Sequence, residues 1–99
     1  MTWAYLLVFS DSFGPRERLK QFLDRQPTVT YWYSCLPHAI FFTATVSAGA
    51  ISDRLRQEFG ASDGKRWFIT EVHEDRQGML PRQVWHMLRH PESPRLPSG

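Results

Sequence analysis

The chain of 99 residues contains a single cysteine, Cys35, and has a net charge of only +2. One cysteine excludes an internal disulfide and a cysteine-based zinc site, and it fits a reducing compartment. The apolar runs are too short for a membrane span. No charged segment followed by an apolar core and a small-residue cleavage site opens the sequence, so we expect a soluble cytoplasmic protein.

Common catalytic fingerprints are also missing. The sequence has no phosphate-cradling glycine loop, no nucleophile elbow and no dinucleotide fingerprint, so it does not indicate an enzyme of those classes. Ten of the twelve basic residues are arginine. Arginine favours bidentate contacts with phosphate or carboxylate, which favours an anionic or acidic partner. The arginines are interleaved with acids, so an ordinary solvated surface is the alternative.

Apolar residues, in contrast, are plentiful. They make up 41% of the chain, and aromatic residues make up 14%. This composition is typical of a folded chain. The length is near the lower end of the sizes that hold a hydrophobic core without disulfides or bound metals. We expect a single domain over residues 1–90, followed by a flexible, proline-rich tail over residues 91–99.

The stretch from Trp3 to Phe9 organises the rest of the chain, because both of its alternating sets of side chains are apolar. Such a strand needs cover on both faces. It ends in Ser10-Asp11-Ser12, and Gly14-Pro15 then opens a helix. The pattern therefore predicts a buried central strand that delivers Asp11 to the edge of a sheet.

The remaining elements follow from apolar periodicity, caps and turn residues. The patterns predict, in order, a helix from Pro15 to near Gln26, strands over 28–34 and 39–46 joined as an antiparallel hairpin, a helix between Ser47 and Gly60, a strand over 65–73, and a helix over about 80–90. The order β-α-β-β-α-β predicts an α+β, ferredoxin-like fold. In it, a four-stranded antiparallel sheet carries helices on one face, and a short C-terminal helix docks against the domain.

The second face of this sheet needs a partner, because it is also apolar. We expect the bulky set of the first strand to point away from the helices and to form a dimer face: Trp3, Tyr5, Leu7 and Phe9. A homodimer packed sheet on sheet is the leading explanation, since monomers rarely expose large apolar patches. The alternatives are a stacking platform for bases, or partial cover by the C-terminal helix with Trp85 or Met87.

The middle of the chain resembles a known family. The motifs are an apolar first strand ending in Asp11, the aromatic stretch Trp32-Tyr33, a hairpin, and Phe42-Thr43-Ala44-Thr45-Val46-Ser47-Ala48 leading into a helix with Ile51, Asp53 and Leu55. Together they resemble the small ferredoxin-fold subunit of CRISPR adaptation complexes, a group related to VapD-type toxin ribonucleases. The closer likeness is to short, uncharacterised bacterial members, and it covers roughly residues 4–73.

This resemblance implies a dimer with facing sheets in which Asp11 of each subunit meets its symmetry mate to hold a divalent metal. Mg²⁺ suits such a site, because it takes carboxylate oxygens and keeps several waters, and it would activate a water against a phosphodiester. Ser10 and Ser12 could add hydroxyl contacts, and Arg16 or Arg18 could neutralise phosphate charge. The alternative is that Asp11 only orders the strand-to-helix turn by bonding local backbone amides.

Other titratable groups have ordinary explanations. His86 and His90 have the spacing of a metal-binding pair on a helix, but no third ligand follows and no Glu stands next to the first His, which favours a solvated helix face. Glu71 and His73 share a strand face, which is typical of a charged strand end. Cys35 is expected to pack.

Two functions from different classes follow. The first is a small dimeric binding or assembly protein of a nucleic-acid-related system, which need not be catalytic and whose partner is nucleic acid or another protein subunit. The second is a Mg²⁺-dependent endonuclease that uses Asp11 at the dimer axis.

Overall fold

The elements of the chain follow the predicted order. The computed structural model describes residues 1–60 and 64–96. Its elements are β1 (Trp3–Phe9), the 3-10 turn η1 (Asp11–Phe13), α1 (Arg16–Arg25), β2 (Val29–Leu36), β3 (Ala39–Ala44), α2 (Ala48–Phe59), β4 (Trp67–Glu71) and α3 (Arg82–Arg89).

The sheet has the strand order β2-β3-β1-β4, and every neighbouring pair is antiparallel. Together with the positions of α1 and α2 in the chain, this order confirms the predicted α+β, ferredoxin-like fold. Because β1 and β2 are both antiparallel to β3, they run in the same direction. Their carboxyl ends therefore reach the same end of the sheet.

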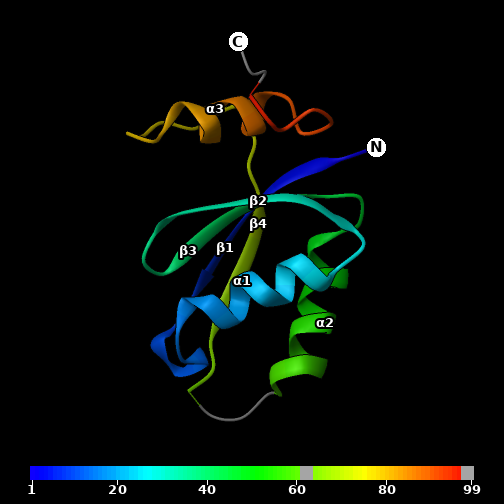
Figure 1. Ribbon diagram of the computed structural model, residues 1–99, viewed down its shortest axis with the longest axis vertical. Helices are drawn as coiled ribbons and strands as arrows, with labels where there is room; N and C mark the ends of the chain where they lie inside the picture. Colours follow the sequence, from blue (N-terminus) through cyan, green and yellow to red (C-terminus); the bar gives the residue numbers. More distant parts are fainter. Residues whose placement is uncertain (61–63, 97–99) are drawn as a thin grey trace.

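The helices form layers on both sides of this sheet. Helices α1 and α2 cover one face, and α3 lies across the opposite face (Figure 1). No described helix is both long enough and apolar enough to cross a membrane.

The boundaries of α2 come from its predicted caps. The side-chain oxygen of Ser47 accepts a hydrogen bond from the backbone N–H of Ala50 at 3.2 Å, which satisfies one of the first amides of the helix. The helix ends at Gly60, whose φ of 82° is a conformation that residues with a Cβ rarely adopt. This local chemistry fixes where α2 delivers the chain to β4.

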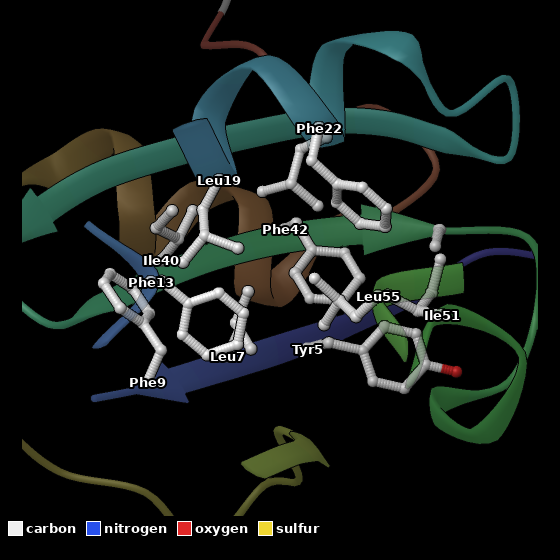
Figure 2. Packing of buried hydrophobic residues seen from close by; sticks show 12 residues of the cluster. Tyr5, Leu7, Phe9, Phe13, Leu19, Phe22, Ile40, Phe42, Ile51 and Leu55 are labelled. Carbon is white, nitrogen blue, oxygen red and sulfur yellow. The ribbon is translucent and has the colours of Figure 1, made fainter. Parts of the chain in front are cut away.

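The main core lies between the sheet and the layer of α1 and α2. Tyr5, Leu7 and Phe9 of β1 are buried there (Figure 2). Trp3 packs against the same cluster. The expectation that these four side chains form an open dimer face is therefore wrong. The space between helices and sheet is filled by the bulky set of β1 rather than by the small one, because a protein interior is closely packed and large side chains leave fewer voids there.

A second cluster forms on the opposite face. Ala4 and Phe41 are buried there beneath α3, together with the apolar side of that helix: Val84, Met87 and Leu88. Cover of this face by the C-terminal helix was one of the alternatives expected from the sequence. The helix covers only part of the face. Three apolar side chains remain exposed beyond it, and we call them the uncovered patch: Val8 (41%), Leu36 (39%) and Phe68 (65%).

Residues that follow α3 fold back onto it. His86 Nε2 donates a hydrogen bond to the carbonyl oxygen of Ser93 at 2.9 Å, and the amide of Leu96 donates to Gln83 Oε1 at 2.9 Å. The guanidinium carbon of Arg95 lies 5.1 Å from the ring centre of Tyr31 on β2. The predicted tail therefore contacts the domain as far as residue 96, and residues 97–99 lie outside the described part.

The two faces of β1 give a direct test of this arrangement. Leu7→Ala should lower the free energy of unfolding by about 2–5 kcal/mol, because it empties space in the main core. Val8→Ala, on the exposed side of the same strand, should cost less than about 1 kcal/mol. Urea unfolding of both variants measures the difference. A Val8→Ala variant that loses as much stability as Leu7→Ala would contradict the assigned faces.

Candidate functional site

One end of the sheet brings together several polar side chains from separate segments. We call it the sheet end, and it consists of residues 10–12 after β1, residues 37–38 between β2 and β3, and residues 64–66 before β4. These segments meet because β1 and β2 end where β3 and β4 begin. The fold therefore brings together groups that are up to 56 residues apart in the chain.

Ser10 joins two of these segments. Its backbone amide donates to the carbonyl oxygen of Arg66 at 2.9 Å, and its hydroxyl oxygen accepts from the amide of Arg66 at 3.1 Å. The same hydroxyl donates to the carbonyl oxygen of Gly64 at 3.0 Å, and Ser12 donates to that oxygen as well. The two serines thus fasten the segment before β4 to the end of β1.

Asp11 reaches the sheet end as predicted, and its side chain is 90% exposed. One of its carboxylate oxygens, Oδ1, is hydrogen-bonded to His38 Nε2. A carboxylate only accepts, so Nε2 carries the hydrogen. The carboxylate is thus held by a side chain across the sheet end, while the serines bind the backbone of the segment before β4.

His38 was not assigned a role from the sequence. It lies in the hairpin loop, where its carbonyl oxygen accepts from the amide of Phe9 at 3.1 Å. Its ring is half exposed and packs edge-on to the ring of Phe9 at 6.0 Å between centres. The predicted topology contained the necessary signal, because parallel β1 and β2 place the residues after each strand at the same end.

The two predicted phosphate contacts separate in space. Arg16 donates from Nη1 to the carbonyl oxygen of Leu36 at 2.7 Å, so its guanidinium lies beside the hairpin at the sheet end. The guanidinium carbon of Arg18 instead lies 5.7 Å from the ring centre of Phe59 on α2. The structure therefore brings Arg16 toward the Asp11–His38 pair, whereas Arg18 extends toward the other helix.

The described part of the chain brings few metal-ligating side chains close together. Within residues 1–60 and 64–96, no group of three or more His, Cys, Asp or Glu side chains is arranged to hold a metal ion. His86 and His90 lie with their ring centres 4.9 Å apart, but His86 Nε2 is already bonded to a backbone carbonyl. Within the same described residues, a divalent ion at Asp11 would not find two further such ligands beside it.

Cys35 packs against the cluster beneath α3. Burial raises the pKa of its thiol, and the opposing effects of a backbone hydrogen bond and of the Arg16 charge are smaller. The neutral thiol is therefore favoured over the nucleophilic thiolate, as expected for a packing residue.

Comparison with protein-family models, curated proteins and solved structures finds no match to this chain. The resemblance to the CRISPR adaptation subunit stays a prediction from the sequence motifs.

The hydrogen bonds of Ser10 at the sheet end should contribute to the free energy of unfolding. Ser10→Ala leaves the amide of Arg66 without its acceptor, which should cost about 1 kcal/mol of stability in urea unfolding. Ser93→Ala removes an exposed hydroxyl beyond α3 and serves as the control. Equal stability of the Ser10→Ala variant and the wild type would contradict the proposed link.

Proposed function

We propose that this protein is a small dimeric binding or assembly protein of a nucleic-acid-related system, with the sheet end as its contact surface. The observation that supports the proposal is that the fold places cationic residues from separate segments at this end of the sheet. Arg16 comes from the start of α1, and Lys65 and Arg66 come from the segment before β4. Guanidinium groups match the geometry of phosphate oxygens, and their charge attracts a polyanion.

The uncovered patch supports the dimer in this proposal. Val8 pairs with Phe68 across β1 and β4, and with Ala39 across β1 and β3, while Ala39 pairs with Leu36 of β2. The patch therefore extends across one face from β2 to β4, with Ala39 of β3 between its members, next to the sheet end. A second copy that packs its own patch against this one would remove these side chains from water.

Oligomeric state tests the dimer. Sedimentation at micromolar concentration should give twice the chain mass of 11.6 kDa. Phe68→Glu should shift the protein to monomer, because it places a charge in the contact. Met79→Glu is the matched control, since Met79 is 97% exposed outside the patch. A wild-type protein that is a strict monomer would refute dimerisation.

Nucleic-acid binding is tested with fluorescently labelled single-stranded and double-stranded oligonucleotides. Affinity should fall as salt rises, because phosphate contacts release condensed counterions. Arg16→Gln should weaken binding about tenfold, the scale of one lost charge-assisted contact. Arg82→Gln changes net charge equally on α3 and should have a smaller effect. If wild-type protein binds neither oligonucleotide at low salt, this part of the proposal fails.

A Mg²⁺-dependent endonuclease is the second candidate, and the position of Asp11 favours it. Asp11 is exposed three residues beyond Val8, so a dimer over the uncovered patch would have its two sheet ends near the contact. Asp11 carboxylates from the two subunits would supply the oxygen ligands that Mg²⁺ prefers, with its remaining positions held by water.

The nuclease mechanism requires the carboxylate of Asp11 as a metal ligand. With Mg²⁺ or Mn²⁺, the wild-type protein should cleave RNA or DNA, and Asp11→Asn should abolish cleavage because an amide is a weaker metal ligand. Asp75→Asn, an exposed position outside the sheet end, should leave cleavage unchanged. Cleavage that survives Asp11→Asn would exclude Asp11 as the metal ligand.

A further inference from the structure

A hollow of about 440 Å³ lies beside the start of β4, where α2 faces the strand. It is shallow and open to solvent. The described residues that line it are Ser52, Arg56, Lys65, Arg66 and Trp67. None of them is acidic, and they combine three cations, one hydroxyl and one indole ring.

The aromatic ring of this hollow is held in a fixed orientation. Trp67 Nε1 donates to Ser52 Oγ at 2.9 Å, and the ring packs edge-on to Phe13 at 5.6 Å between centres. The guanidinium carbon of Arg56 lies 6.0 Å from the ring centre. Trp67 is only partly buried, so part of this ordered ring is accessible from the hollow.

The cations differ in how firmly they are held. Lys65 Nζ donates to the carbonyl oxygen of Phe59 at 2.6 Å, which holds its ammonium at the end of α2. Arg56 Nη1 lies 3.6 Å from Asp53 Oδ1, and both side chains are more than half exposed, so this ion pair is weak and leaves the guanidinium open to a second anion. Arg66 is exposed at its side chain while its backbone is bound to Ser10.

We propose that this hollow binds one nucleotide unit of a single-stranded nucleic acid, with the phosphate on Arg56, Lys65 and Arg66 and the base against Trp67. The inference rests on the proposed binding function and specifies its substrate class. An aromatic ring on a protein surface stacks with an unpaired base, whereas the bases of a duplex are stacked on each other and present only their edges.

The position of the hollow connects it with the sheet end. Arg66 lines the hollow, and its backbone is bonded to Ser10, the neighbour of Asp11. A strand whose nucleotide occupies the hollow is therefore next to the Asp11–His38 pair. The hollow determines which form of nucleic acid is bound, and it contains no group that the nuclease alternative requires.

The test is a salt titration of binding to a fluorescent oligothymidylate for four proteins. These are the wild type, Arg66→Gln, Trp67→Phe and the control Arg82→Gln. Wild-type protein should bind the single strand at least tenfold more tightly than a duplex of equal length. Arg66→Gln should reduce the slope of log affinity against log salt by about 0.7, the contribution of one single-strand phosphate contact. Trp67→Phe should weaken binding several-fold with the slope unchanged, because a smaller ring stacks less strongly.

Urea unfolding of each variant confirms that it is folded at the assay temperature. An Arg66→Gln variant that loses no more than Arg82→Gln would overturn the site, since net charge alone would then explain binding. Equal affinity for duplex and single strand would overturn the substrate class.

Absence of any oligonucleotide binding by the wild type would refute the proposed function. In that case, the protein is titrated with inorganic tripolyphosphate while the NMR signal of the Trp67 indole N–H is followed. This measurement separates the two proposals. A shift of that signal that is lost in Arg66→Gln supports an anion site in the hollow. An unmoved signal overturns it.

Discussion

Burial of β1 on both faces is the constraint on which the rest of the structure depends. Hydrogen bonds to β3 and β4 occupy both edges of the strand. Leu7 faces the layer of α1 and α2, and Ala4 faces α3. A strand bound on four sides has little freedom, so the residues that follow it are held firmly. This is why Ser10 and Asp11 are presented at a defined place although Asp11 itself is almost fully exposed.

The fold was predictable from the sequence because its signals are local. Caps such as Ser47 and Gly60, and the periodicity of each segment, gave the correct order of strands and helices, with strand ends displaced by a few residues: β3 ends at Ala44 and β4 begins at Trp67. Which side of β1 points toward α1 and α2 was not predictable in the same way, because both alternating sets of its side chains are apolar. The choice depends on the volume between layers and on where α3 docks, and both are non-local.

The residues of the candidate site also differ in whether local sequence patterns could reveal them. Asp11 was found because strand and helix patterns locate it, whereas His38 becomes visible only when two parallel strands are traced to a common end. Arg16 and Arg18 appeared equivalent in sequence. Positions two residues apart on a helix, however, point about 200° apart around its axis, and of these two side chains it is Arg16 that bonds the hairpin. The hollow beside Trp67 depends on the contact of α2 with β4, which no short motif encodes.

Helix α3 limits the sheet surface that would be available to a second subunit. It buries the part of the second sheet face near Ala4 and Phe41, the role first expected of a dimer partner. The apolar area that remains around Val8 and Phe68 lies toward the sheet end, so the proposed dimer would have its contact near Asp11. In this proposal, dimerisation and metal binding at the sheet end would therefore depend on each other. The same helix that stabilises the single chain would direct the proposed association to the end of the sheet that carries Asp11.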